Sequence, residues 1–240
     1  MRIDAKDMHF KELNDLIKES KDKEIEITDL TGQRYIAAGS KGQDIKIHGV
    51  PGNALGAFLN GSKVEVFEDA EDATGDTMND GEIIIHGSAG DACGYAMRGG
   101  KIYIRDKAGY RAGIHMKAYK DKQPLIIIGD SAGSFLGEYL AGGTIIVLGL
   151  EAGGAAPVGY FTGTGMHGGR IILRAKELPK DLPAQVVASS ATKEEKEEIK
   201  SLISEFCTLF SLDIDAIMKQ HFFILKPNSV APYKRLYTHI

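Results

Sequence analysis

Short β-branched stretches recur in this chain at a nearly fixed spacing. Four of them begin 19 residues apart, and the same spacing returns once after a short insertion. The seven stretches start at Ile45, Val64, Ile83, Ile102, Ile126, Ile145 and Ile171. A period of about 20 residues is typical of a solenoid, because each unit is too small to bury its hydrophobic face alone and stacks on its neighbours. The repeat therefore predicts a stack of short strands.

The glycines follow the same repeat. Of the 29 glycines, all but Gly32 lie between Gly39 and Gly169. Many occupy two columns, seven and eleven positions after the strand start: Gly52, Gly90, Gly109 and Gly133 in the first, and Gly56, Gly75, Gly94, Gly113 and Gly137 in the second. Glycine is favoured where the backbone takes positive φ or approaches another backbone closely. We interpret these nine as structural turn glycines.

Other columns of the repeat are apolar and predict the interior. One of them holds only leucine or methionine, at Leu59, Met78, Met97, Met116, Leu140 and Met166. Equivalent positions in neighbouring coils lie about 4.8 Å apart, so each column becomes a ladder of like residues. Parallel crossovers are almost always right-handed, and a period of 19 does not suit the left-handed hexapeptide helix. The sequence predicts an all-β fold, a right-handed parallel β-helix of about seven coils.

Composition excludes several classes of function. The 29 basic and 33 acidic residues leave a formal net charge of −4, which gives no general attraction to nucleic acid or to an anionic membrane. Segment 1–7 lacks the apolar run of a signal peptide, and the apolar stretches are too short to span a membrane. Cys93 and Cys207 have no metal-ligand spacing and imply no disulfide framework. We expect a cytoplasmic protein.

The start of a solenoid exposes a sheet edge that has to be covered. Apolar residues at helical spacing between Met8 and Ile17 predict a helix. We expect an extended pair, at 25–27 and 35–37, to follow it. Together these elements predict an N-terminal cap over residues 1–40, followed by the β-helix over residues 41–174.

The far end is expected to carry a helical cap and a tail over residues 175–240. A proline-bearing connection, 177–188, leads to a capping box at Thr192–Glu195 and then to an amphipathic helix. A second short helix is expected at 213–220 and a strand at 222–225. The last residues, 232–240, are interpreted as a tail.

Three features that could carry chemistry have better structural explanations. A G-x-G-x-x-G run at 163–168 is followed by a predicted strand, whereas a dinucleotide fingerprint needs a helix there. His48 and His86 are two coils apart, which is too far for a shared zinc ion. The acidic turn at 68–76 lacks the calcium β-roll pattern, although a metal or small molecule there stays open. We therefore predict no catalytic, cofactor-binding or metal-binding residue.

The outward-facing centre of the strands is charged in the first two coils and apolar in the last five. The members of this stripe are Ile84, Tyr103, Ile127, Ile146 and Ile172. A contiguous apolar surface usually marks an interface. The stripe is therefore a candidate interface, covered by the C-terminal helix, by a partner or by both.

Two runs of the chain resemble a known family. The segments Gly87–Ile104 and Gly137–Gly149 are similar to the GXGXG-motif β-helix that ends the large subunit of glutamate synthase. The third subunit of formylmethanofuran dehydrogenase carries the same repeat. The resemblance covers about residues 40–174 and does not extend to catalytic parts. Arg2 stands where the amidotransferase has its cysteine nucleophile. The iron–sulfur cluster of the family takes three cysteines, whereas this chain has only Cys93 and Cys207.

The resemblance implies a non-catalytic scaffold subunit of a split glutamate synthase, an oxidoreductase that moves the amide nitrogen of glutamine to 2-oxoglutarate. Its partners would be an amidotransferase subunit and a synthase subunit, and FMN and the iron–sulfur cluster would be bound by those partners. A β-helix subunit of a formylmethanofuran dehydrogenase-like oxidoreductase is the alternative, followed by a free-standing binding protein. Self-association is also compatible with the stripe.

Overall fold

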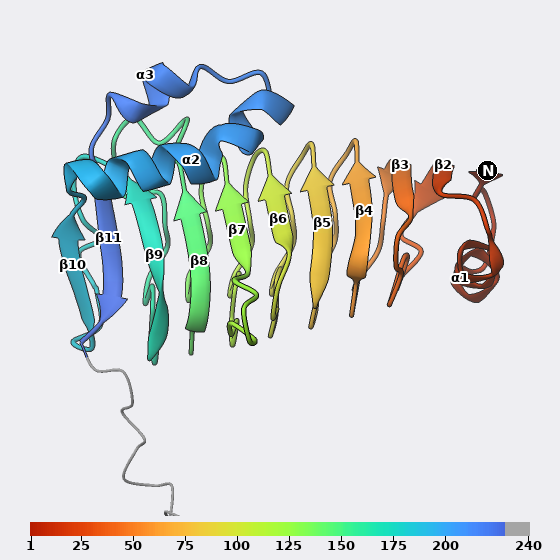
Figure 1. Ribbon diagram of the computed structural model, residues 1–240, viewed down its shortest axis with the longest axis horizontal. Coiled ribbons are helices and arrows are strands. Elements are labelled where there is room, and N and C mark those ends of the chain that lie inside the picture. Colours follow the sequence, from red (N-terminus) through yellow and green to blue (C-terminus); the bar gives the residue numbers. More distant parts are fainter. Residues whose placement is uncertain (229–240) are drawn as a thin grey trace, which may run out of the picture.

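Eleven strands form one mixed sheet that does not close on itself (Figure 1). The computed structural model describes residues 1–228. The strand order across the sheet is β1 to β9 in sequence order, then β11 and β10. The strands are β1 Arg2–Asp4, β2 Glu24–Thr31, β3 Asp44–Val50, β4 Asn60–Val66, β5 Asp80–Ile85, β6 Lys101–Ile104, β7 Leu125–Ile128, β8 Ala141–Val147, β9 Gly168–Arg174, β10 Val186–Ser190 and β11 Phe222–Pro227. The helices are α1 Phe10–Glu19, α2 Lys193–Leu209 and α3 Ile214–Met218.

The repeat predicted from the sequence is confirmed in the sheet. Strands β1 to β9 pair in parallel. The seven predicted strand starts are direct Cα partners, from Ile45 with Val64 through to Ile145 with Ile171. All seven side chains are fully buried. Parallel strands that are buried on both faces favour β-branched residues, which is why isoleucine dominates here.

A second, thinner ladder forms in the loops that connect the strands. Single-residue parallel bridges join Ala70, Ala89, Ala108, Ala132 and Val158 in turn. Further along the loops, the N–H of Gly75 donates to the carbonyl of Leu55 at 2.7 Å, and the N–H of Gly94 donates to Thr74 at 2.7 Å. The leucine and methionine column and the strand isoleucines belong to one buried cluster. Each loop therefore stacks on the loop one repeat unit away.

The parallel order ends after β9. Strand β11 inserts antiparallel beside it, with Ile224 opposite Ile172, and β10 pairs antiparallel on the outer side of β11. At the other end, β1 pairs with β2, and α1 lies beside them (Figure 1). Leu13 and Ile17 of α1 are buried against the core. One end of the sheet is thus covered by α1, and the other ends in the antiparallel strands β11 and β10.

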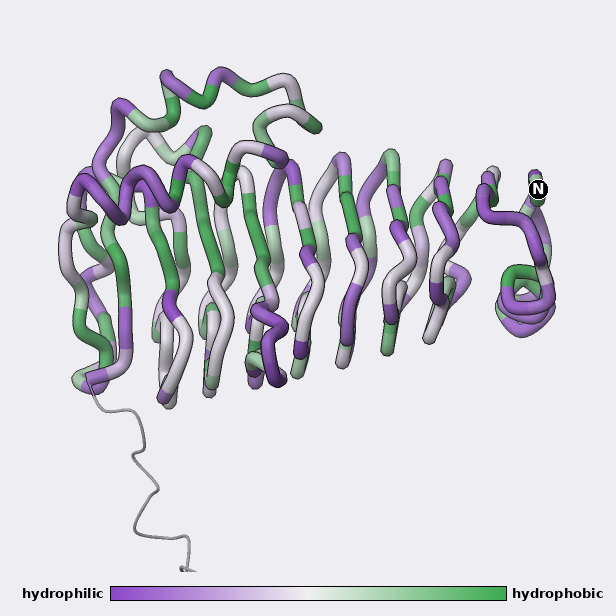
Figure 2. Tube along the Cα trace, viewed as in Figure 1, coloured by the Kyte–Doolittle hydropathy of each residue, from purple (hydrophilic) through white to green (hydrophobic). Residues whose placement is uncertain are grey.

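Helix α2 runs across the strands from β10 toward β6 (Figure 1). The predicted capping box is confirmed: Thr192 Oγ1 accepts the Glu195 N–H at 3.2 Å, and Glu195 Oε2 accepts the Thr192 N–H at 3.0 Å. Ile199, Ile203 and Phe206 are among the residues that the helix buries. Figure 2 shows the hydrophobic strand segments of this half of the sheet and the hydrophilic stretches of the helix above them.

The expected extended pair at 25–27 and 35–37 is wrong in its second half. Residues 25–27 lie in β2, but Tyr35 and Ala37 adopt φ of 61° and 59° in a turn. The reason is that residues 24–43 form a further repeat unit, in which Ile25 pairs with Ile45 and the turn stacks on the next one. The run of parallel strands therefore starts earlier than the seven expected stretches.

The connection expected at 177–188 also needs a correction. Its last residues begin β10, which starts at Val186 and completes the antiparallel edge on β11. The expected short helix and final strand are confirmed as α3 and β11. The tail expected at 232–240 lies outside the described residues. Within residues 1–228, no helix is both long and apolar enough to span a membrane.

Candidate interaction surface

The loops contain a turn in which every second residue has positive φ. Three such residues occur in each of seven turns, and the middle one is glycine in six of them. The triplets are Tyr35-Ala37-Gly39, Ala54-Gly56-Phe58, Ala73-Gly75-Thr77, Ala92-Gly94-Ala96, Arg111-Gly113-His115, Phe135-Gly137-Tyr139 and Phe161-Gly163-Gly165. The backbone thus turns a sharp corner at the same place in every repeat unit.

Packing explains why the middle position of the corner is glycine. A Cβ on Gly94 would lie 2.5 Å from Cδ1 of Ile126, and a Cβ on Gly113 would lie 2.4 Å from Cδ1 of Ile145. The same approach, at 2.5 to 2.8 Å from a strand isoleucine, occurs at Gly56, Gly75 and Gly137. These five predicted turn glycines therefore combine positive φ with direct contact to the core.

The other glycine column has a different cause. A Cβ on Gly90 would lie 2.3 Å from Oδ1 of Asp72, and a Cβ on Gly52 would lie 2.1 Å from the carbonyl oxygen of Gly32. A Cβ on Gly109 would lie 2.2 Å from Oδ1 of Asp91, and a Cβ on Gly133 would lie 2.8 Å from the backbone of Gly109 and Tyr110. At two of these sites the crowding atom belongs to an aspartate whose carboxylate accepts a backbone N–H of the next loop: Asp72 from Asp91 at 2.8 Å and Asp91 from Tyr110 at 2.8 Å.

Exposed aromatic side chains gather at the corners of the last repeat units. Large side chains at the outer positions of the corner are exposed or half-buried. We call this the corner surface. Its members at outer corner positions are Arg111, His115, Phe135, Tyr139 and Phe161, and its other members, Tyr95, Tyr110 and Tyr160, lie within a corner or directly before one. Phe135 is half-buried and the other seven are exposed. Tyr160 is 69% exposed and Phe161 is 50% exposed. Exposed aromatic surface of this extent is a mark of an interaction site.

Two rows of packed rings lie within the corner surface. In one row, the ring of His115 stacks on Tyr139 at 5.0 Å and meets the edge of Tyr95 at 5.9 Å. In the other, the ring of Phe135 stacks on Phe161 at 5.1 Å. These contacts hold the rings in place before any partner arrives.

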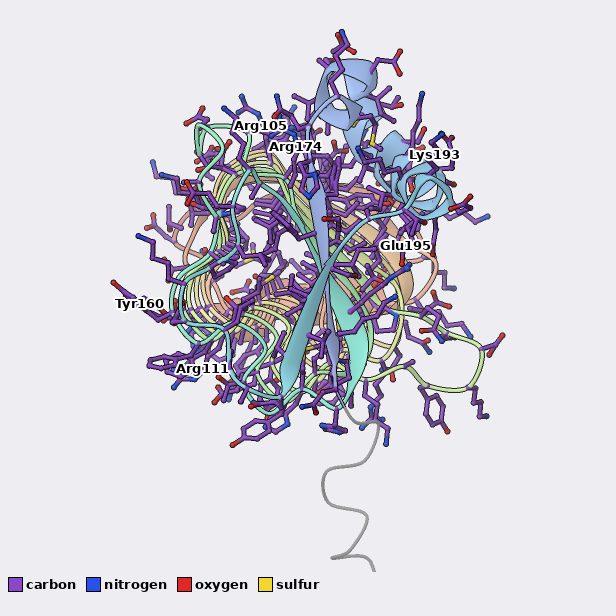
Figure 3. The ribbon with its side chains drawn as sticks, turned by 90° about the vertical axis from the view of Figure 1, so that its left-hand side faces the viewer. Arg105, Arg111, Tyr160, Arg174, Lys193 and Glu195 are labelled. Atoms are coloured by element: carbon purple, nitrogen blue, oxygen red, sulfur yellow. The ribbon has the colours of Figure 1, made fainter. Side chains whose placement is uncertain are left out.

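Arg111 extends the row formed by Phe135 and Phe161. Its guanidinium lies 4.9 Å from the ring centre of Phe135, and its Nε donates to Glu138 at 3.1 Å. Figure 3 shows Arg111 and Tyr160 on one side of the molecule, away from Lys193 and Glu195 at the start of α2. Aromatic residues and arginine are the types most enriched in the energetically important part of protein interfaces.

The predicted apolar stripe is not part of this exposed surface. Ile84, Tyr103, Ile127, Ile146 and Ile172 are all fully buried. They share one hydrophobic cluster with Ile199, Ile203 and Phe206 of α2 and with Ile224 of β11. The edge of the Tyr103 ring meets Phe206 at 6.0 Å. The C-terminal elements of the chain itself therefore cover the stripe.

A polar cluster fixes the C-terminal part of α2 to the sheet. The Tyr103 hydroxyl donates to Glu205 at 2.8 Å, and Lys101 pairs with the same carboxylate. The bond from Lys101 lowers the pKa of Glu205, although burial opposes it. Burial raises the pKa of Glu82, the Glu205 carboxylate raises it further, and Lys63 opposes both. The Tyr103 pKa is raised by burial first and by the bond to Glu205 second.

Three further titratable side chains, those of His48, His86 and Cys93, have structural surroundings that explain their positions. The ring of Phe67 lies between His48 and His86, at 4.7 and 5.1 Å, and His86 Nε2 is 2.9 Å from Glu65. Cys93 is fully buried, and burial raises its pKa to about 12. In the described part of the chain, no group of three or more histidine, cysteine, aspartate or glutamate residues could hold a metal ion.

Sequence reasoning missed the corner surface because it followed glycine. The outer corner positions carry Arg111, Phe135 and Phe161 although their φ values are near 60°. Residues other than glycine rarely adopt positive φ. The glycine pattern therefore gives no sign of these outer positions. The available signal was a recurrence of aromatic residues at fixed distances from the bridging column: Phe135 and Phe161 lie three positions after Ala132 and Val158, and His115 and Tyr139 lie seven positions after Ala108 and Ala132.

A comparison with protein families gives a match to the GXGXG motif family over residues 21–231. An uncharacterized protein of Methanocaldococcus jannaschii is 47% identical over 98% of this chain and 95% of its own length.

Among solved structures, the fold is similar to that of a chain in the formyltransferase/hydrolase complex from Methylorubrum extorquens, which was solved with methylofuran. The TM-score is 0.67 at 22% identity, over 84% of this chain and 72% of that chain. At this identity the likeness concerns the fold alone. The family match spans β2 to β11 together with α2 and α3, so the chain belongs to the GXGXG motif family.

Proposed function

We propose that this chain is the non-catalytic scaffold subunit of a split glutamate synthase. In this role it joins an amidotransferase subunit to a synthase subunit, and those partners bind FMN and the iron–sulfur cluster in the cytoplasm. The observation that carries the proposal is the corner surface, which presents ordered aromatic side chains and Arg111 to solvent. Surface of this composition supports binding to another protein.

The division of labour between the two apolar surfaces supports the same role. The stripe is covered by α2, which leaves the corner surface as the exposed aromatic area of the last repeat units. Five of its rings pack on one another, so these side chains lose little freedom when a partner binds. A rigid, pre-ordered surface suits a subunit whose task is to hold others at a fixed separation.

The alternative is a subunit of a formylmethanofuran dehydrogenase-like oxidoreductase. It is supported by one observation, the fold likeness to a chain of the formyltransferase/hydrolase complex. The corner surface serves either role. We place glutamate synthase first because the glycine and strand pattern of Gly87–Ile104 resembles its GXGXG domain.

We also propose that the stacked units form a right-handed parallel β-helix over residues 41–174, between caps at 1–40 and 175–240. The parallel register of β3 to β9 and the ladder of alanine bridges support this architecture. The pairing of β2 with β3 adds the unit at 24–43 to the stack.

Co-purification tests the scaffold role. The chain carries an affinity tag and is co-expressed with the amidotransferase and synthase subunits of the same organism. We expect both subunits to be retained by the tagged chain, and at least one to be lost from the double variant Tyr139→Ala/Phe161→Ala.

Tyr119→Ala is the matched control, because Tyr119 is also about half exposed but lies in the insertion before β7, outside the corners. Circular dichroism melts establish that each variant is folded. Retention of neither subunit by the unmodified chain contradicts the proposal, and so does full retention by the double variant. Retention of formylmethanofuran dehydrogenase subunits instead supports the alternative.

A further inference from the structure

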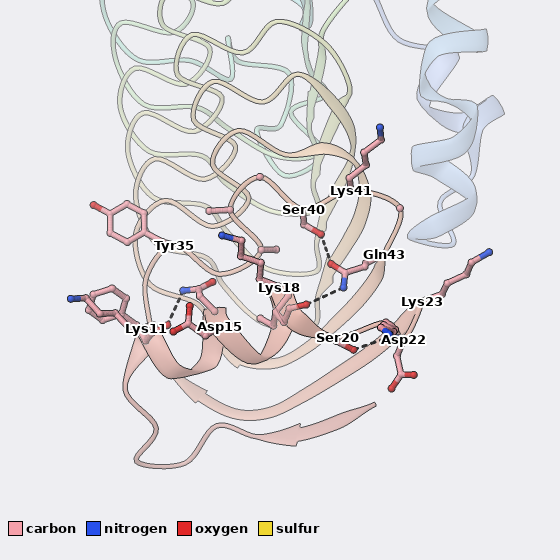
Figure 4. Close-up of a pocket in the computed structure, with 18 residues that line it drawn as sticks. Lys11, Asp15, Lys18, Ser20, Asp22, Lys23, Tyr35, Ser40, Lys41 and Gln43 are labelled. Carbon is pink, nitrogen blue, oxygen red and sulfur yellow. Dashed lines mark hydrogen bonds between the residues drawn. The ribbon is translucent and has the colours of Figure 1, made fainter.

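A trough lies between α1 and the first corner of the repeat (Figure 4). Its volume is about 820 Å³. It runs along the whole of α1, from Phe10 to Ser20, and its opposite wall is formed by residues 35–43. A helix of this length extends for about 15 Å. The trough is therefore elongated rather than a compact hole.

Lysines dominate the polar lining. Lys11 and Lys18 come from α1, Lys21 and Lys23 from the segment after it, and Lys41 from the facing turn. Among residues 1–228, none of these five ammonium groups forms an ion pair. This positive area belongs to a chain whose formal net charge is −4.

The two carboxylates of the trough do not neutralise it. Asp22 pairs with the N-terminal ammonium group of Met1 at 3.1 Å, which leaves Asp15 against five lysines. The walls between the charges include the ring of Tyr35, which is 46% exposed, and the buried side chains of Ile17 and Ala37.

The floor of the trough is fixed by hydrogen bonds. Gln43 Nε2 donates to the carbonyl of Ile17 at 3.1 Å, and the Ser40 hydroxyl donates to Gln43 Oε1 at 2.7 Å (Figure 4). These bonds tie α1 to the facing turn. The separation between the lysines of α1 and Lys41 is thus set by the fold before any ligand binds.

From this arrangement we propose that the trough binds an extended acidic segment of a partner protein. The charge complementarity is direct, and a length of about 15 Å matches four or five residues of extended chain. A compact phosphate fits less well, because phosphate is typically held by backbone N–H groups at a helix N-terminus. Here the first turn of α1 is capped by His9, and the lysines are spread along the helix. The inference deepens the proposed function by naming a second contact for a partner subunit.

A labelled octa-glutamate peptide tests the inference on the full chain by fluorescence anisotropy. We expect saturable binding that weakens when sodium chloride rises from about 50 to about 500 mM, because exposed charges are screened. The double variant Lys11→Glu/Lys18→Glu should weaken binding by roughly tenfold, because the loss of two exposed ion pairs at about 0.7 kcal/mol each amounts to about 1.4 kcal/mol. Lys180→Glu, an exposed lysine after β9, is the matched control and should bind as the unmodified chain does.

Both altered lysines on α1 are exposed, so the double variant is expected to melt at the same temperature as the unmodified chain. Three outcomes overturn the inference: no peptide binding, equal loss in the Lys180 variant, or displacement of the peptide by inorganic phosphate at a concentration that leaves ionic strength unchanged. Each is distinguishable from failure of the proposed function. If the Lys11→Glu/Lys18→Glu variant still co-purifies with the partner subunits, the scaffold role is supported and the trough is not part of it.

Discussion

The substitution Gly94→Ala isolates the packing requirement at the middle of a corner. Gly94 has φ of 71°, and a Cβ there would lie 2.5 Å from Cδ1 of Ile126. Ile126 is fully buried in the sheet, so its side chain has little room to move. The variant therefore carries two penalties, one from the backbone conformation and one from the collision.

The size of each penalty follows from the geometry. A left-handed conformation costs an L-residue about 1 to 2 kcal/mol, and overpacking a core by one methyl group costs about 1 to 3 kcal/mol. The loss of glycine freedom in the unfolded chain offsets about 0.4 to 1 kcal/mol. We expect a net destabilisation of about 1 to 4.6 kcal/mol.

Gly39→Ala is the matched control, because Gly39 has φ of 68° in the first corner but no atom within 4 Å of its added Cβ. It should be less destabilising than Gly94→Ala. The double variant Gly94→Ala/Ile126→Val removes the colliding Cδ1 atom. It should lose less stability than the sum of the single variants, by roughly 1 kcal/mol. Guanidinium unfolding followed by circular dichroism measures the free energy of unfolding of these three variants and of the single variant Ile126→Val. Equal effects at Gly39 and Gly94, or strict additivity in the double variant, would refute the reasoning.

Two further predictions concern the attachment of α2. Phe206→Ala removes a fully buried ring that packs on Tyr103. It should destabilise the C-terminal half by about 3 to 5 kcal/mol and increase the binding of a hydrophobic dye. Unchanged unfolding and unchanged dye binding would contradict this prediction. Glu82→Gln should raise the melting temperature at pH 7, because the raised pKa of Glu82 means that folding favours its protonated form, and this contribution is lost as pH rises through the folded pKa. The difference between Glu82→Gln and the unmodified chain should vanish below about pH 4, and an equal gain at pH 4 and pH 7 would contradict the assignment.

The repeat could be predicted because one constraint acts on every unit. A buried parallel strand needs β-branched residues at fixed positions, and the corner needs glycine where a strand isoleucine approaches. These two requirements leave a periodic record, from which the register of Ile45 through Ile171 followed directly. The helix start at Thr192 was predictable for a local reason, since a capping box depends on residues three apart.

Features set by long-range contacts left no such record. Tyr35 and Ala37 look like strand residues, but stacking on the next unit places them in a corner. Strand β10 contains Ser189 and Ser190 and becomes a strand because β11 pairs with it. The corner surface arises when stacking brings together residues such as Tyr95, His115 and Tyr139, which are about 20 residues apart in sequence. The stripe, by contrast, was recognisable as apolar, but its burial depends on where α2 docks.

The scaffold role is tested most directly by reconstitution of glutamate synthesis. The purified amidotransferase and synthase subunits are supplied with glutamine, 2-oxoglutarate and a reductant, and glutamate formation is measured with and without this chain. We predict that the chain alone forms no glutamate, and that adding it to the two subunits raises coupled turnover. The corner variant Tyr139→Ala/Phe161→Ala should give less of this increase, whereas Tyr119→Ala should give all of it. Full coupled turnover by the two subunits without this chain would contradict the account.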